Sequence, residues 1–372
     1  MIFITFSSLW SFTFFFLTSY VILLISVLVY LLPILGKTLF FSNVQVRSHF
    51  RFIGTFDFFW ISVTPVILIL LLAWVWVSPT FTVWFGQLVV GSFQLKLLYF
   101  LLFNFFIYLV VFNSTHYFTS TEVFDYVIVL YHLFYWVYFL FLANSVFTVI
   151  FIIEVINVLV FLLVTSTTFS STFFYKSLGL NYSHNLTLNT PHTYIQALLY
   201  LFWISLVSSL GIFLFLIFFY FTTLTFDWVL VEYVFLYITS VSSLKDILVF
   251  GVVWLVLLIS LFLKCGVAPV YFWKPTFFRG LPLTALFFYI TFIYFNFLLF
   301  ITHFITLHLG EVFYYYVFIF WFLLVISLLT LLLILIESYY IKVFLALSSI
   351  LNSLLVFLLV TGVHTSSLLF IF

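Results

Sequence analysis

The sequence contains few charged residues: Asp, Glu, Lys and Arg make up 5% of its 372 positions, and the formal net charge is +1. Ordinary soluble domains carry about 25% charged residues, so the composition excludes a soluble globular chain. A net charge so close to zero also excludes a broad basic surface for nucleic acid. With 67% hydrophobic residues and a mean hydropathy of +1.43, the whole chain is predicted to be a bundle of membrane helices.

Cysteine is equally scarce, because Cys265 is the only one. A single cysteine excludes a disulfide framework and a thiolate metal cluster within the chain. The sequence also lacks a Gly-rich phosphate loop, a metal-ligand spacing and a nucleophile elbow. We therefore expect no nucleotide, metal or redox cofactor to be bound by this chain itself.

Aromatic residues are abundant instead, with 60 Phe, 24 Tyr and 11 Trp against a single Met. This balance indicates codon bias in a T-rich genome, and organelle genomes are the usual place for such bias. Most of the aromatic side chains are expected to face lipid.

The apolar segments predict an all-α, polytopic bundle of about ten membrane-spanning helices in a single membrane domain, residues 1–372. Helix seven breaks after Lys264, because Gly266 and Pro269 disfavour a helix, and we expect it to continue as a second half through Trp273. Residues 366–372 are interpreted as the start of an eleventh helix. The ten helices are predicted at 9–35, 57–78, 88–112, 124–142, 145–168, 194–221, 247–264, 281–301, 313–336 and 342–361.

The basic residues between helices are distributed unevenly, which predicts the orientation of the chain. One set of alternate loops is expected to lie on the matrix or cytoplasmic side and the other set on the opposite side. The first set holds Lys37, Arg47, Arg51, Lys176, Lys274, Arg279 and Lys342, and the second holds Lys96 and Lys245.

Two ionisable residues fall well inside apolar spans: Glu154 in helix five and Lys264 in helix seven. A lysine at membrane depth costs about 2.5–3.5 kcal/mol on insertion scales, and a broken helix is tolerated there only where protein or water lines the break. Each residue could instead lie near a helix end and extend to the membrane surface. The functional alternative is that the two side chains pair along a hydrated path and share a proton.

The segment around Lys264, KCGVAPVYFWKPTFFRGLPLT, resembles the signature of chain 2 of NADH–ubiquinone oxidoreductase, the respiratory complex I. That family has a pattern close to K-L-G-x-A-P-F-H-F-W-x-P-x-V-x-x-G-x-P-L-T. Residues 342–350 (KVFLALSSI) and 196–209 (QALLYLFWISLVSS) resemble two further family segments. The matching residues of the signature are Lys264, Gly266, Ala268, Pro269, Phe272, Trp273, Pro275, Gly280, Pro282, Leu283 and Thr284.

The resemblance implies a multi-pass, antiporter-like subunit in the membrane arm of complex I, in the mitochondrial inner membrane. Such a subunit contributes to proton translocation coupled to electron transfer from NADH to ubiquinone. It has no redox centre of its own, because FMN, the iron–sulfur clusters and ubiquinone are held by other subunits. Glu154 would be the helix five glutamate of the proton path and Lys264 its partner on broken helix seven.

The chain departs from the family in two respects. Tyr294 stands where the family has a helix eight lysine, so we expect another residue to replace it, with His303 the nearest candidate in sequence, or the relay to be modified. Helices eleven to fourteen are missing, and we expect a separate polypeptide to supply them. Partners are otherwise expected to be membrane-arm subunits and lipids, with no nucleic acid.

Two other functions stay open. An Mrp-type cation/proton antiporter subunit would share the fold but have different partners, and the A-P-x-x-F-W pattern argues against it. A non-conducting structural spacer in the membrane arm would keep the helices without the ion path. Tyr294 and the missing helices favour the spacer, whereas Glu154 and Lys264 argue for proton transfer.

Overall fold

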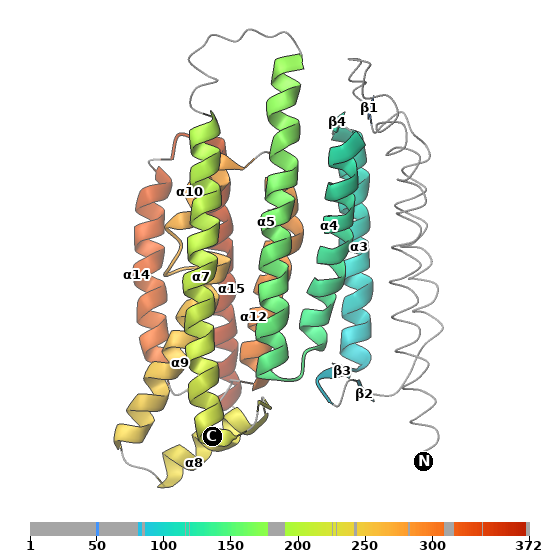
Figure 1. Ribbon diagram of the computed structural model, residues 1–372. Helices are drawn as coiled ribbons and strands as arrows, with labels where there is room; N and C mark the ends of the chain where they lie inside the picture. The colour runs from blue at the N-terminus through green and yellow to red at the C-terminus, as the bar shows by residue number, and fades with distance from the viewer. Residues whose placement is uncertain are drawn as a thin grey trace, which may run out of the picture. The chain divides into compact units, whose positions relative to one another are not determined.

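Six helices of the computed structural model are long and apolar enough to cross a membrane, counting only the residues that the structure describes. These spans are Val146–Thr165, Tyr194–Phe221, Ile247–Cys265, Ala285–Ile305, Phe318–Ile336 and Ile341–Leu359. The structure describes residues 50–51, 81–83, 86–115, 117–118, 120–177, 190–224, 226–227, 229–241, 244–281, 283–308, 316–336 and 338–369. An all-α, polytopic membrane bundle is thereby confirmed (Figure 1).

The helices are joined by short strands that form two antiparallel pairs, β1 with β4 and β2 with β3. In chain order the elements are β1 (Phe50–Arg51), β2 (Phe81–Val83), β3 (Leu88–Val90), α3 (Ser92–Thr115), β4 (Tyr117–Phe118), α4 (Ser120–Leu142), α5 (Val146–Ser177), α7 (Thr190–Thr223), α8 (Val229–Val241), α9 (Leu244–Cys265), α10 (Trp273–Gly280), α11 (Leu283–Phe288), the π-helical turn η2 (Tyr289–Tyr294), α12 (Phe295–His308), α14 (Val317–Ile336) and α15 (Ile341–Leu369).

The chain divides into two compact units. The first unit consists of Met1–Asn144, Val155–Asn181 and Pro282–Phe292. Its described core lies between α3 and α4, where Leu98, Leu101, Leu102 and Phe105 of α3 are buried. Their spacing places them on one face of the helix, and the Phe105 ring lies 5.0 Å from the ring of Phe134 on α4.

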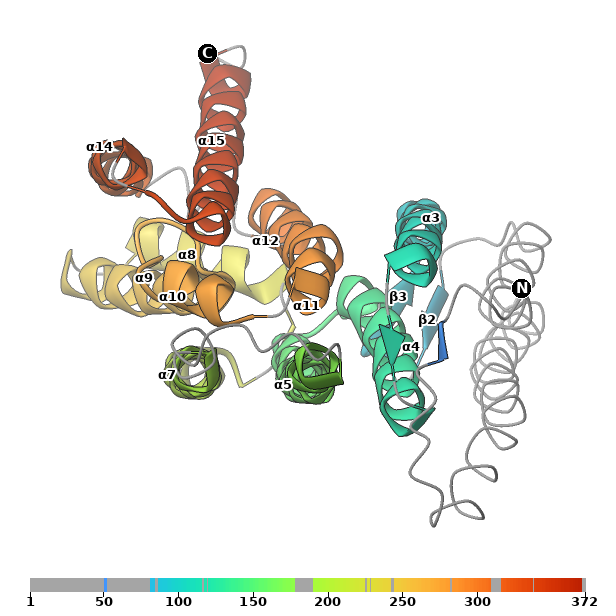
Figure 2. The same ribbon diagram turned by 90° about the horizontal axis from the view of Figure 1, so that it is seen from above.

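The second unit consists of Ser145–Glu154, Tyr182–Leu281 and Ile293–Phe372. In this unit α7 packs against α9 and α10, and α15 packs against α10, α12 and α14. Figure 2 shows α15 between α14 and α12. The ring of Phe262 on α9 joins these helices, because it lies 5.5 Å from Phe320 of α14 and 4.9 Å from Phe357 of α15.

Small residues allow the closest helix contacts in this unit. A Cβ atom at Gly211 of α7 would lie 2.0 Å from Oγ of Ser260 on α9. At Gly251 of α9 it would lie 2.5 Å from the Tyr316 hydroxyl, which donates a hydrogen bond to the carbonyl of Ile247. Close approach at glycine is a common way for membrane helices to pack.

Two helices occur where the sequence predicts loops. Helix α5 continues to Ser177, nine residues beyond its predicted end, and α8 occupies part of residues 222–246, between the predicted helices 194–221 and 247–264. A helix tolerates Ser and Thr in apolar surroundings when their hydroxyls bond to its own carbonyls, as Thr165 does with Leu162 at 2.9 Å.

Helices seven, eight and ten also differ from their predicted form. The second half of helix seven begins at Trp273 instead of ending there, because Pro275 is tolerated in the first turn of α10, where its missing N–H is not needed. Helix eight contains the π-helical turn Tyr289–Tyr294. The predicted start of an eleventh helix is wrong for residues 366–369, which end α15, because a single glycine inside an apolar helix costs only about 1 kcal/mol.

The predicted helices one and two and the linker between them lie outside the described residues, apart from β1. Helices three and four correspond to α3 and α4, whose described apolar segments are the shorter Lys96–Phe105 and Val129–Leu142. The single membrane domain and the total of ten helices stay predictions.

Candidate functional site

The break after α9 is closed by its own backbone. Gly266 lies in the left-handed region at φ +62°, and its N–H donates to the carbonyl of Leu263 at 3.3 Å. The next N–H, of Val267, donates to the carbonyl of Phe262 at 3.0 Å. This is the Schellman arrangement, in which a glycine after the helix lets two terminal carbonyls find donors. Lys264 therefore belongs to the last turn of a properly terminated helix.

Trp273, the first residue of α10, ties the two halves of the broken helix together. Its Nε1–H donates to the carbonyl of Leu263 at 3.0 Å, across a loop that contains the cis Ala268–Pro269 peptide bond. The Leu263 carbonyl thus accepts two hydrogen bonds that replace the helical one it lacks. Because water is absent from the hydrocarbon region, such internal acceptors and donors are what make a break tolerable.

Lys264 points into the second unit because it continues the buried face of α9. Phe250, Trp254, Leu257 and Leu261 are buried at steps of three or four residues, and Lys264 is the next position in that series. Its side chain is 4% exposed. The lysine also lies at the helix C-terminus, where the partial negative charge of the helix dipole stabilises a cation.

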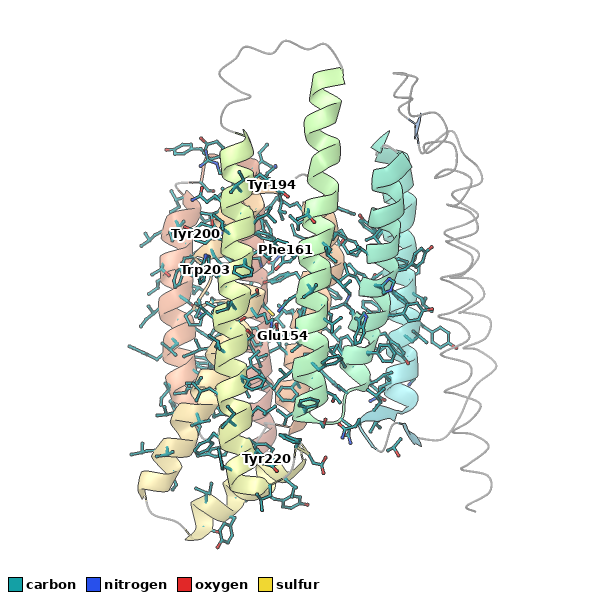
Figure 3. The ribbon with its side chains drawn as sticks, viewed as in Figure 1. Glu154, Phe161, Tyr194, Tyr200, Trp203 and Tyr220 are labelled. Carbon is teal, nitrogen blue, oxygen red and sulfur yellow. The ribbon has the colours of Figure 1, made fainter. Side chains whose placement is uncertain are left out.

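The partner of Lys264 is Glu154, so the structure favours the paired arrangement over the alternative in which each residue extends to the membrane surface. The Nζ atom of Lys264 donates to Oε1 of Glu154 at 2.5 Å. Glu154 lies on α5, nine residues into the helix, and is labelled in Figure 3. The two residues, 110 positions apart in the chain, thus form an ion pair.

The pair is asymmetric, because the Glu154 side chain is 40% exposed whereas the lysine is almost fully buried. A carboxylate and an amine in hydrogen-bond contact exchange a proton with little movement of heavy atoms. One partner opens to the surface of this chain and the other faces its interior. The pair can therefore pass a proton between those two environments.

A second buried lysine, Lys274, lies next to the break, and here the sequence-based expectation is wrong. The sequence places Lys274 in a loop between spans, whereas the structure buries it completely in the first turn of α10. The Nζ atom has no hydrogen-bond partner among the described residues. It lies 3.2 Å from the centre of the Tyr294 ring and 5.6 Å from that of Phe278.

The two weaker candidates have different outcomes. Tyr294 is buried at the end of the π-helical turn, directly under the Lys274 amine, and its hydroxyl donates to the Ser349 carbonyl on α15 at 3.1 Å. His303 is half-buried on α12, nine residues later. At 1.5 Å per residue, its Cα lies about 13 Å farther along the helix than that of Tyr294.

Sequence reasoning missed Lys274 because its neighbours include Gly280 and Pro282, which are typical of a loop. The sequence did contain a signal for its burial. Lys274 lies between Trp273 and the pair Phe277 and Phe278, so a helix over these residues places the lysine among aromatic side chains. Among the described residues, no group of three or more His, Cys, Asp or Glu side chains could hold a metal ion.

The sequence matches no protein-family model and no curated protein. A chain of respiratory complex I from Thermus thermophilus, solved with bound aureothin, has a similar fold, with a TM-score of 0.55 and 15% sequence identity. The likeness covers 89% of this chain and 62% of the Thermus chain, so this chain spans about three fifths of that length. The protein is thus a multi-pass, all-α membrane bundle whose fold is similar to that of a chain of complex I.

Proposed function

We propose that this chain is a membrane-arm subunit of a respiratory complex I, of the kind that its signature segment resembles, chain 2 of NADH–ubiquinone oxidoreductase, and that it contributes to proton translocation. The observation that carries the proposal is the Glu154–Lys264 ion pair beside a broken helix. The fold likeness to a complex I chain supports it. Both residues are ionisable groups inside apolar spans of the sequence, where an unpaired charge is costly.

In this proposal the ion pair is a proton-transfer step. Glu154 takes up a proton at the exposed side, and the pair then separates, because a neutral carboxyl group no longer binds the ammonium strongly. Lys264 is then free to release or accept a proton on the interior side. Separation and reformation of the pair are coupled to movement of the broken helix, whose loop 266–272 is the natural hinge.

The energy for translocation comes from elsewhere in the complex. NADH oxidation and ubiquinone reduction, with FMN and iron–sulfur clusters, belong to other subunits, and this chain contributes no redox centre. The compartment we propose is the mitochondrial inner membrane. A second polypeptide that supplies further helices stays a prediction, and mass spectrometry of the native particle tests it.

The experiment replaces Lys264 by Met in the assembled complex, reconstituted in liposomes. We expect the complex to assemble. The rate of proton translocation coupled to NADH oxidation should fall about tenfold or more, as it does when a general acid–base group is removed. Lys96→Met is the matched control, because Lys96 is exposed on α3. Normal translocation in Lys264→Met excludes the proposed role.

The same preparation distinguishes the other functions. A particle that contains antiporter-type subunits, without flavin and iron–sulfur subunits, assigns the pair to an ion exchanger. A complete complex I whose translocation does not depend on Glu154 or Lys264 makes the chain a structural spacer.

A further inference from the structure

The amine of Lys274 lies in an environment that fits a transient proton carrier better than a fixed structural charge. A buried ammonium without a hydrogen-bond acceptor or counterion costs several kcal/mol, and the described residues provide no acceptor for this one. Filling space does not explain a lysine at this position, because an apolar side chain of similar volume fills the same space without the desolvation cost.

The surroundings nevertheless compensate part of the charge when it forms. The face of the Tyr294 ring lies 3.2 Å from Nζ, and the Phe278 ring lies 5.6 Å away on the same helix as the lysine. An aromatic face stabilises a cation without a formal negative charge. The protonated and neutral forms of the amine are therefore both compatible with this pocket, which a proton carrier requires.

The backbone around the pocket is specialised for this arrangement. A Cβ atom at Gly266 would lie 3.0 Å from Cδ of Lys274, so the lysine stem passes directly over the glycine that ends α9. Tyr294 closes a π-helical turn, a feature frequent at functional sites. The hydroxyl of Tyr294 is held by the Ser349 carbonyl, which fixes the ring beneath the amine.

The pocket also lies next to the ion pair. Cys265 directly follows Lys264 in the chain, and Lys274 packs against the next residue, Gly266. Both lysines thus adjoin the backbone turn that ends α9.

We propose that Lys274 is a second proton-binding group of the ion path, which exchanges a proton with Lys264 on the interior side of the Glu154–Lys264 pair. This inference rests on the proposed function. In the step, an N–H bond of the Lys264 ammonium breaks, its electron pair stays on that nitrogen, and a new N–H bond forms on the neutral Lys274 amine. The total charge of the site is unchanged, and Lys264 is ready to accept the next proton from Glu154.

The test uses the assembled complex in liposomes and compares Lys274→Met, Lys264→Met and the Lys96→Met control. We expect Lys274→Met to lower coupled proton translocation by about tenfold or more, as Lys264→Met does. The double variant Lys274→Met with Tyr294→Lys places an amine in the same pocket from the opposite side. It should recover part of the lost translocation.

The outcomes separate the two proposals. Loss in Lys264→Met with normal translocation in Lys274→Met overturns the role of Lys274 and leaves the proposed function standing. Normal translocation in both variants overturns the proposed function. If Lys274→Met does not assemble, Lys274→Gln takes its place, because it keeps a polar side chain that cannot carry a proton. Loss of translocation in the assembled Lys274→Gln complex supports the carrier, and normal translocation overturns it.

Discussion

The Nζ atom of Lys264 and the Oε1 atom of Glu154 are 2.5 Å apart, and the two side chains differ tenfold in exposure, 4% against 40%. Removing the glutamate and removing the lysine therefore have different consequences. Glu154→Gln leaves a buried ammonium with a neutral neighbour, whereas Lys264→Met leaves a carboxylate that reaches the surface of the chain.

We predict that Glu154→Gln lowers the stability of the purified protein more than Lys264→Met does. Loss of one partner from a fully buried pair costs about 3–5 kcal/mol, and exposure of the glutamate reduces this here. Thermal unfolding of both single variants and the double variant forms a double-mutant cycle. A coupling of about 1–3 kcal/mol is expected, and a coupling near zero contradicts a functional ion pair.

Gly266→Ala should destabilise the broken helix. The alanine would have to adopt φ +62°. For an L-residue, this left-handed conformation costs about 1–2 kcal/mol of folding free energy. Its Cβ atom would also press on Lys274 and Trp273, at 3.0 and 3.1 Å.

Gly86→Ala is the control for this prediction. Gly86 has φ +84°, and a Cβ atom there meets nothing within 4 Å, so only backbone strain remains. The apparent melting temperature should fall farther for Gly266→Ala than for Gly86→Ala. Equal shifts in melting temperature would mean that the Lys274 side chain moves away from the new Cβ atom without loss of stability.

Trp273→Phe should weaken the closure of the break while its ring still fills most of the space. The variant loses the Nε1–H donor to the Leu263 carbonyl, a hydrogen bond of 3.0 Å. An under-satisfied buried polar group costs about 1–3 kcal/mol.

Hydrogen exchange measured by mass spectrometry checks this prediction, with faster exchange expected in residues 263–273. Trp203→Phe is the matched control, because Trp203, labelled on α7 in Figure 3, is 58% exposed. Unchanged exchange in Trp273→Phe contradicts the role assigned to the indole.

Gly211→Val should separate α7 from α9. Even the first side-chain carbon at Gly211 falls 2.0 Å from the Ser260 hydroxyl oxygen, which donates to the Val256 carbonyl at 2.6 Å. Overpacking of this kind costs about 1–3 kcal/mol.

A compensating pair checks the contact at Gly211. Gly211→Ala with Ser260→Ala should melt closer to the unmodified protein than Gly211→Ala alone, because the clashing oxygen is gone. A pair no more stable than the single variant contradicts the direct contact.

Several parts of this site were predictable from single features of the sequence. Lys264 and Glu154 stood out because an ionisable group inside an apolar span is costly enough to need a partner, and the structure places them in contact. Gly266 and Pro269 located the break, because backbone limits at glycine and proline act locally.

Other parts depended on neighbours that local sequence does not specify. The predicted ends of α5 and α15 were wrong where Ser, Thr or Gly indicated a loop but the helix continued. Helix α8 was not predicted, because charged residues such as Asp227 and Glu232 interrupt the apolar pattern there. Tyr294 was identified as a departure from a family pattern, yet its contact with Lys274 was not foreseen.

The sequence by itself determined that this protein is a bundle of membrane helices with an interrupted helix and two ionisable residues inside apolar spans, because hydropathy, helix breaking and charge cost act over a few residues. Only the tertiary structure decided that Lys274 is buried. Its side chain leaves the surface because α7 and α15 pack against α10, and contacts between segments so far apart along the chain depend on the fold as a whole.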